Sequence, residues 1–272
     1  MYRFVLRVLA IAVLPVVGCG AAELKIGGTG ASLGLLKQLG EEFSKTYPGD
    51  RLVVFPGLGS SGGILAAAEG ALDFAMSSRT LKADEKARGL DILPVLDTPF
   101  VFISSHPQPQ KLTRSDVIAI YDGALATWPD GKHIKLVLRP KSDSTTDFLN
   151  ANFEGMQRAL EKLRQRPDLP VAATDQDNTD AAEGIANSFS GATLLQLLTE
   201  KPKLRQITLD GIEASTATME NGSYPLKMRL YIVMKSGSSP PARRFLDFLN
   251  STQAEKIFRD NGAARVTARS AL

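Results

Sequence analysis

Three short segments of this sequence combine glycines and hydroxyl side chains in positions suited to binding an anion. They are residues 27–32, 57–63 and 139–146. Each follows a short apolar run that predicts a β-strand and precedes a predicted helix start. The start of a helix exposes unpaired N–H groups at the positive end of the helix dipole, and glycine lets an anion approach them closely. We expect the three segments to hold one anion from several sides.

Arg139 adds a positive charge at the start of the third segment. It follows the predicted strand at residues 134–138 and precedes a hydroxyl run that ends at Thr146. A guanidinium group suits a tetrahedral oxyanion because its planar fork donates two charge-assisted hydrogen bonds. Arginines and serine-threonine runs are also common in ordinary loops, so the position between a strand and a helix is what favours an anion site.

The second segment also fits the G-x-S-x-G pattern of serine hydrolases, with Ser61 as the nucleophile. Such an enzyme needs a histidine base, and the sequence has only His106 and His133. His106 lies in a proline-rich linker and His133 beside a Gly-Lys turn, which are positions typical of exposed loop histidines. The sequence therefore favours a protein without enzymatic activity, and a secreted serine hydrolase is the alternative.

Cofactor and metal motifs are not indicated. Gly28-Thr29-Gly30 does not extend to a dinucleotide-binding pattern, because Leu33 stands where the third glycine is needed. With one cysteine and two histidines, a metal site of the usual ligands is not expected. The net charge of +3, the 7% of aromatic residues and the absence of basic runs speak against a nucleic-acid partner.

Residues 1–22 have the pattern of an export signal, with two arginines and an apolar run too short to span a membrane. Residues 16–19 look like a lipobox, in which Cys19 is lipidated and becomes the new N-terminus. The alternative is an ordinary signal peptide that is cut a few residues later. Both interpretations place the mature protein outside the cytoplasmic membrane, in the periplasm or bound to the membrane through a lipid. Cys19 is the only cysteine, so no internal disulfide is possible.

Strand and helix patterns alternate from residue 24 onward, which predicts an α/β fold with a parallel sheet and helices on its faces. Ligands of such sheets bind beyond the carboxyl ends of the strands, where the three segments lie. Residues 93–105 predict a longer strand region, broken by Asp97-Thr98-Pro99. With 43% hydrophobic and 22% charged residues, the 272-residue chain is long enough for two modest soluble domains.

The chain resembles the periplasmic phosphate-binding proteins of ABC-type phosphate importers over nearly all of its length after the signal. The matching motifs are Gly30-Ala31-Ser32, residues 57–63, residues 73–78, residues 111–116 with Thr127-Trp128, Arg139 with Ser144-Thr145-Thr146, residues 210–215 and residues 221–226.

The resemblance implies a type II periplasmic binding protein fold, with two α/β lobes joined by two crossings and an anion in the cleft. Lobe I would comprise residues 23–109 and 213–272, and lobe II residues 110–212. The resemblance further implies a monomer that captures phosphate or a similar tetrahedral oxyanion and hands it to the membrane subunits of an ABC permease. A sensory protein on the same fold, without transport, is the alternative.

The resemblance also implies which residues contact the ligand. By position they are Ser32 and Leu33 (backbone), Ser60, Ser78, Arg139, Asp143, Ser144 and Thr145, with the neighbouring Ser61 and Arg79 as further candidates.

Two positions depart from the family pattern. The family usually has an aspartate where this chain has Ser78, and that aspartate accepts the proton of a protonated phosphate. Asp143 stands where the family usually has a serine. We hypothesise that Asp143 has taken over the acceptor role, and the alternative is that it caps the following helix.

Overall fold

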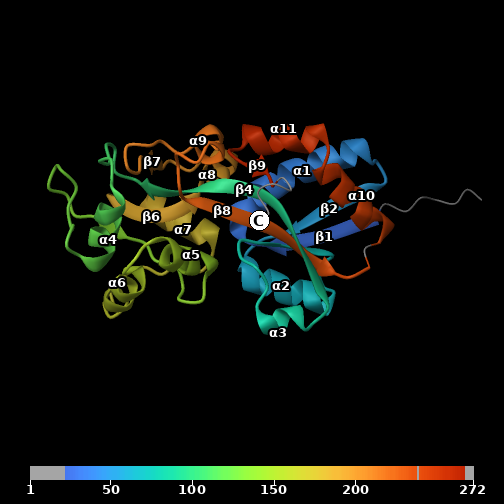
Figure 1. Ribbon diagram of the computed structural model, residues 1–272, viewed down its shortest axis with the longest axis horizontal. Helices are drawn as coiled ribbons and strands as arrows, with labels where there is room; N and C mark the ends of the chain where they lie inside the picture. The colour runs from blue at the N-terminus through green and yellow to red at the C-terminus, as the bar shows by residue number, and fades with distance from the viewer. Residues whose placement is uncertain (1–21, 238, 267–272) are drawn as a thin grey trace, which may run out of the picture.

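The computed structural model describes residues 22–237 and 239–266 (Figure 1). Cys19 and nearly all of the predicted export signal lie outside the described residues, so lipidation stays a prediction. In the part of the chain that the structure describes, no helix is long and apolar enough to cross a membrane.

The strands form one mixed sheet with the order β2-β1-β3-β8-β4-β6-β5, and β7 and β9 pair with β4 beside this path. Their bounds are β1 (Ala22–Gly28), β2 (Asp50–Phe55), β3 (Phe74–Ser77), β4 (Leu90–Ser104), β5 (Lys135–Leu136), β6 (Ser188–Thr193), β7 (Arg205–Ile207), β8 (Lys227–Lys235) and β9 (Ala264–Arg265). Pairing is parallel between β1 and its neighbours β2 and β3 and between β5 and β6. β4 and β8 run antiparallel to each other and to their other neighbours. The α/β class is confirmed, but the sheet is parallel only on its two flanks.

Helices cover both faces of this sheet. Figure 1 shows α1, α10 and α11 on one side of β1 and β2, and α2 with α3 on the other. The bounds are η1 (Gly30–Ser32, a 3-10 helix), α1 (Leu33–Thr46), α2 (Gly59–Glu69), α3 (Ala83–Lys86), α4 (Arg114–Asp122), α5 (Ser144–Asn152), α6 (Met156–Leu163), α7 (Asp175–Gly184), α8 (Leu194–Glu200), α9 (Thr216–Glu220), α10 (Pro240–Leu249) and α11 (Thr252–Asp260). The three segments singled out from the sequence thus include η1, which leads into α1, and the first residues of α2 and α5.

β4 connects two parts of the molecule, which we call lobe I (around β1, β2 and β3) and lobe II (around β5 and β6). Residues 90–99 of β4 pair with β8, and residues 100–103 pair with β6. In Figure 1, β4 and β8 run from one lobe to the other. The predicted lobe boundaries at 109/110 and 212/213 stay a prediction.

The break expected at residues 97–99 does not occur, because β4 continues through them as a strand. The Asp97 carboxylate accepts hydrogen bonds from Arg229 of β8 at 2.8 and 3.0 Å. The Thr98 hydroxyl donates to the Gly262 carbonyl oxygen at 3.0 Å and accepts from the Leu195 N–H at 3.2 Å. These tertiary partners satisfy side chains that would otherwise compete for the backbone and favour a turn.

Aromatic side chains fill the core of each lobe. In lobe I, Phe43 of α1 meets Phe245 of α10 edge to face, with 5.3 Å between ring centroids. In lobe II, Phe102 of β4 stacks on Phe189 of β6 at 5.2 Å. All four rings are at most 1% exposed. Each lobe is therefore a well-packed unit that holds its loops in fixed positions.

Two glycines allow α2 to start against the end of β1. A Cβ atom on Gly63 would lie 2.6 Å from the Cα atom of Gly28. Gly28 itself has φ +124°, and a Cβ atom there would lie 2.0 Å from the Met76 carbonyl oxygen. Only glycine fits such close backbone contacts. This packing brings the start of α2, with Ser60, next to the carboxyl ends of β1 and β3.

Candidate anion-binding site

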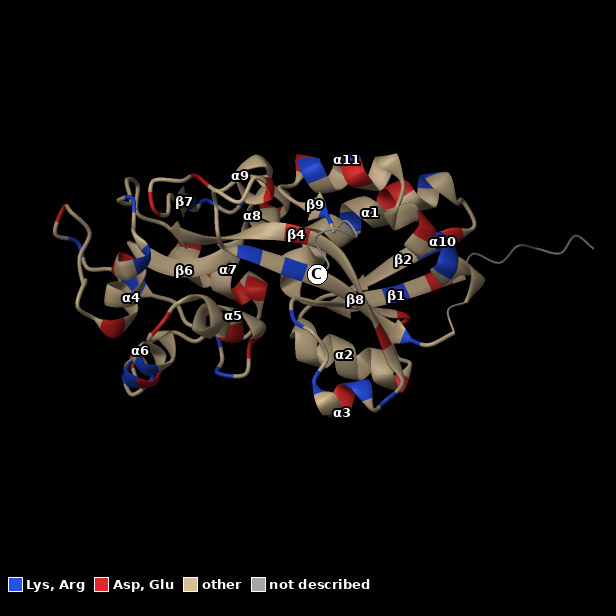
Figure 2. Ribbon diagram, in the orientation of Figure 1, with Lys and Arg blue, Asp and Glu red and all other residues tan. Residues whose placement is uncertain are grey.

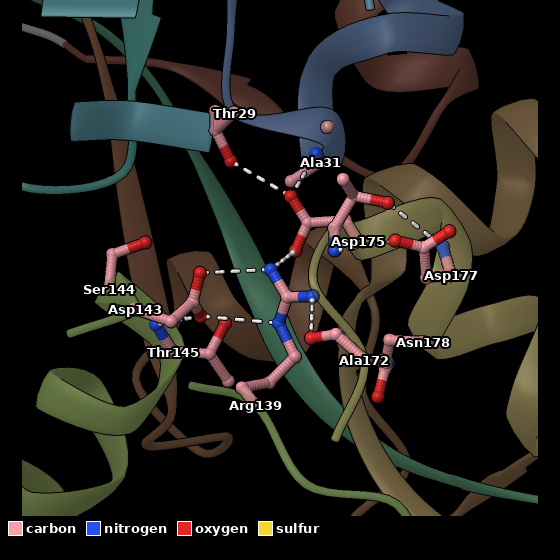
Figure 3. Close-up of polar contacts among 12 residues, drawn as sticks. Thr29, Ala31, Arg139, Asp143, Ser144, Thr145, Ala172, Asp175, Asp177 and Asn178 are labelled. Atoms are coloured by element: carbon pink, nitrogen blue, oxygen red, sulfur yellow. Dashed lines mark hydrogen bonds and ion pairs between the residues drawn. The ribbon is translucent and has the colours of Figure 1, made fainter. Parts of the chain in front are cut away.

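Arg139 lies on lobe II, and its guanidinium group is held by three acceptors (Figure 3). Nη1 donates to the Ala172 carbonyl oxygen at 2.9 Å. Nε and Nη2 donate to the two carboxylate oxygens of Asp143 at 3.2 and 2.9 Å. Nη2 also lies 3.3 Å from Oδ1 of Asp175, and the Arg139 side chain is only 5% exposed. The predicted cleft cation is therefore buried and faces two carboxylates of its own chain.

Asp175, the first residue of α7, connects the two lobes through its carboxylate. Oδ2 accepts hydrogen bonds from the Ala31 N–H at 2.9 Å and from the Thr29 hydroxyl at 3.2 Å, both in lobe I. Oδ1 faces Arg139 of lobe II (Figure 3). Burial raises the pKa of Asp175, and the Asp143 charge adds to this, while Arg139 and the two donors of lobe I act in the opposite direction. A carboxylate thus lies at the helix start where we expected an external anion.

Asp143 caps α5, as in the alternative considered from the sequence. Its Oδ1 accepts a hydrogen bond from the Thr145 N–H at 2.9 Å, in addition to the contact with Arg139. Aspartate is among the best residues for this position because its carboxylate satisfies an N–H group at the helix start. The cap and the ion pair use both carboxylate oxygens, so the structure favours a positioning role for Asp143. The acceptor role stays a hypothesis.

Three predicted hydroxyl groups come together across the cleft. The Ser78 Oγ lies 3.1 Å from the Ser60 Oγ, and the Ser78 N–H donates to that same oxygen at 3.1 Å. On its other side, the Ser78 Oγ lies 2.7 Å from the Ser144 Oγ of lobe II. The structure thus brings these three predicted site residues together and shows them bonded to one another, and their contact with a ligand stays a prediction.

The cavity beside Ser78 and Asp175 has a volume of ≈ 10 Å³, which is about enough for one water molecule. Its walls include Thr29, Ala31, Ser78, Thr145 and Asp175. Figure 2 shows acidic residues where α5 and α7 face lobe I. The cleft is therefore closed in this structure, and its acidic side chains are placed around one arginine.

Ser32 and Leu33 form hydrogen bonds within the first turn of their own helix. The Ser32 hydroxyl donates to the Thr29 carbonyl oxygen at 2.9 Å, and the Leu33 N–H donates to the Gly30 carbonyl oxygen. Ser32 is fully buried. In this closed structure neither residue offers the free donor that we expected, and the Ala31 N–H takes that role.

Ser61 and Arg79 form a separate cluster with Glu85. Arg79 makes a bidentate contact with Glu85 at 2.8 and 2.7 Å, and its Nη2 donates to the Ser61 hydroxyl at 2.9 Å. The hydrogen bond from Arg79 lowers the pKa of Glu85. His106, a candidate base for Ser61, instead lies in lobe II, where its Nε2 is 3.0 Å from Asp130. The described residues thus give Ser61 no histidine partner.

Sequence reasoning missed Asp175 and the contacts of lobe I with α7. Gln176 also crosses between the lobes, because its amide donates to the Gly30 carbonyl oxygen at 2.9 Å. A local pattern was available: Thr174 and Asp177 form a capping box, which places Asp175 at a helix start. This segment has no glycine, unlike residues 27–32 and 57–63, so the capping box is the local signal that could have pointed to it.

The two roles of Asp143 can be separated by substitution. We expect Asp143→Asn to keep the cap, because asparagine caps a helix as well as aspartate, and to lose the charge opposite Arg139. Asp143→Ala loses the cap as well as the charge, and should reduce the free energy of unfolding by about 0.5–2 kcal/mol more than Asp143→Asn. Urea denaturation of both variants measures this difference. Equal stabilities would contradict the capping role.

Comparison with known families identifies the chain. A family model described as the PBP superfamily domain matches residues 16–253, which is most of the sequence. The chain belongs to the PBP superfamily. Among its relatives, the phosphate-binding protein PstS of Staphylococcus saprophyticus is 25% identical over 266 residues, covering 88% of this chain and 78% of the relative. The PstS-like family predicted from the motifs is confirmed.

Solved structures show the same PBP architecture. One is a putative phosphate ABC transporter substrate-binding protein with bound phosphate from Clostridium perfringens, with a TM-score of 0.78 and 21% identity, covering 90% of this chain and all of that chain. Another is an ABC-type phosphate transport receptor from Vibrio cholerae, with a TM-score of 0.63 and 19% identity, covering 89% of this chain and 99% of that chain. At these identities the similarity establishes the fold, and the predicted two-lobed fold is confirmed.

Proposed function

We propose that this PBP-superfamily protein captures phosphate or a similar tetrahedral oxyanion between its lobes and delivers it to an ABC permease. The observation that carries the proposal is the donor set around Asp175. A helix-start N–H and a hydroxyl of lobe I face the Arg139 guanidinium of lobe II, and together they hold an anionic group. These are the donors that bind oxyanions in proteins.

The relatives support this assignment. The Staphylococcus saprophyticus relative is named a phosphate-binding protein, and the Clostridium perfringens structure contains phosphate. Neither is named as an enzyme, and the family argues against the serine hydrolase alternative. The N-terminal export pattern agrees with a binding protein that works outside the cytoplasmic membrane. Lipidation of Cys19 and a monomeric state belong to the proposal as expectations.

We place the ligand between the turn at Thr29 and Ala31 in lobe I and Arg139 in lobe II. The surrounding hydroxyl groups would be those of Ser60, Ser78, Ser144 and Thr145. Ser60 and Ser78 approach from lobe I, and Ser144 and Thr145 stand at the start of α5 in lobe II. A ligand that replaces the direct contacts between these hydroxyl groups would be held by both lobes. Ser32 and Leu33 could join only after the first turn of their helix rearranges, and Ser61 and Arg79 would act at the margin of the site.

Calorimetric titration of the mature protein with phosphate, sulfate, arsenate and molybdate in turn tests this function. We expect one-to-one binding of at least one of these anions. Arg139→Lys should bind it at least about tenfold more weakly, because lysine has no planar fork with which to donate two hydrogen bonds. Arg166→Lys is the control, because Arg166 forms an exposed pair with Asp168. Absence of binding to all four anions at millimolar concentration would contradict the proposal.

A further inference from the structure

We propose that Asp175 is a specificity-determining residue of this site: its carboxylate is an internal ligand that closes the cleft, and an incoming oxyanion binds by displacing it. The second half of this inference rests on the proposed function. The first half concerns the contacts of Asp175 with both lobes and does not depend on which anion binds.

The contacts of Asp175 are those that an external anion would make. Its Oδ2 accepts hydrogen bonds from the Ala31 N–H and the Thr29 hydroxyl of lobe I, and its Oδ1 lies 3.3 Å from Nη2 of Arg139 in lobe II. A negative group at the start of a helix is stabilised by unpaired N–H groups and by the helix dipole. One carboxylate thereby connects lobe I and lobe II, as a bound oxyanion would.

The space around Asp175 does not admit a second anion. The adjoining cavity of ≈ 10 Å³ has room for about one water molecule, whereas a tetrahedral oxyanion has four oxygen atoms around a central atom. An anion therefore enters only when the lobes separate and the carboxylate moves. The side chain is free to move without loss of the cap of α7, because Thr174 and Asp177 form that cap.

Charge leads to the same conclusion. Asp143 and Asp175 already share the Arg139 guanidinium, and Asp143 is held in place by its cap. A further anion beside both carboxylates would place three negative groups around one cation in a largely buried site. Burying charge without a partner is strongly unfavourable, so the new anion replaces Asp175 rather than joining it.

An internal ligand of this kind selects among anions. Asp175 is tethered at the site, so a free monocarboxylate that makes the same contacts has no advantage over it. Chloride offers a single atom and cannot contact Arg139 and the loop at Thr29 and Ala31 in the way that the two carboxylate oxygens do. A tetrahedral oxyanion offers oxygens to both lobes and, when doubly charged, a stronger attraction to Arg139. The site therefore admits phosphate-like anions and rejects acetate and chloride.

Three variants test the inference. Asp175→Asn removes the charge at nearly constant shape, Asp175→Ala removes the acceptor, and Asp180→Asn makes the same charge change at an exposed position of α7. By calorimetry, we expect Asp175→Asn to bind phosphate at least tenfold more tightly than the wild type and Asp180→Asn to match the wild type. We also expect acetate to compete with phosphate in Asp175→Asn but not in the wild type.

Small-angle scattering without ligand provides a readout that does not depend on anion binding. We expect Asp175→Ala to have a larger radius of gyration than the wild type, because the contacts of Asp175 with Thr29 and Ala31 of lobe I and with Arg139 of lobe II are lost. Unchanged or weaker phosphate binding by Asp175→Asn would overturn the proposal that the anion displaces Asp175. An unchanged radius of gyration for Asp175→Ala would overturn the proposal that Asp175 closes the cleft. If no variant binds any tested anion but the radius increases, displacement and the proposed function both fail while closure by Asp175 is supported. Binding by Asp175→Asn but not by the wild type would support the whole inference.

Discussion

Replacing Arg139 with alanine is expected to reduce the free energy of unfolding by about 3–5 kcal/mol, because it leaves buried charges without their partner. Asp143 and Asp175 both face the guanidinium group, and the Ala172 carbonyl oxygen accepts a hydrogen bond from it. The Arg139 side chain is 5% exposed, so water cannot easily take over these contacts. Guanidinium chloride denaturation measures the change, and calorimetry should show no remaining phosphate binding.

Arg166→Ala is the matched control for this substitution. Arg166 and Asp168 form a pair whose side chains are 55% and 64% exposed, so water screens the pair and the loss of stability should be far smaller than for Arg139→Ala. Adding Asp175→Asn to Arg139→Ala should recover part of the lost stability, because one unpaired charge is removed. A loss for Arg139→Ala no larger than the control would mean that the guanidinium contacts contribute little to stability.

Gly28→Ala is expected to have an effect of similar size, through the backbone. Gly28 has φ +124°, and a Cβ atom there would lie 2.0 Å from the Met76 carbonyl oxygen and 2.8 Å from its nitrogen. Both atoms belong to β3, and that carbonyl oxygen also accepts a hydrogen bond from the Thr29 N–H. We expect a loss of about 3 kcal/mol or more, combining backbone strain with overpacking.

Gly28→Ala should also weaken anion binding, because it moves Thr29 and Ala31 away from their positions next to Asp175 and opposite Arg139. Gly57→Ala separates strain from crowding: Gly57 has φ +77°, but nothing lies within 4 Å of the position of its Cβ atom. We expect a loss of about 1–2 kcal/mol there, from strain alone. Thermal unfolding and calorimetry of both variants measure the effects, and similar losses for the two glycines would contradict the close packing of β1 on β3.

The sequence predicted the parts of the site that depend on local signals. A strand, a glycine-rich turn and a helix start can be recognised within about a dozen residues. Arg139 and Ser144 were therefore assigned to one site, and the family resemblance added Ser78. The structure brings Ser78 and Ser144 into contact and places Arg139 nearby, opposite the turn at Thr29 and Ala31. The α/β class follows from the same alternation of strands and helices.

The missed features depend on contacts between distant parts of the chain. Asp175 and Ala31 are 144 residues apart, and nothing in the local sequence around either residue indicates the other. Asp97-Thr98-Pro99 resembles a turn, and it is a strand because Arg229, Gly262 and Leu195 supply partners from elsewhere. The antiparallel position of β8 between β3 and β4 likewise arises from a return of the chain that the alternation of strands and helices does not reveal.

A crystal structure of the wild-type protein with bound arsenate would test the central claim most directly, because the anomalous signal of arsenic locates the anion without ambiguity. We expect one arsenic peak between the turn at Thr29 and Ala31 and the guanidinium group of Arg139, with the Asp175 carboxylate turned away from both lobe I donors. Arsenate bound only elsewhere, or Asp175 still bonded to Thr29 and Ala31 beside it, would contradict this account.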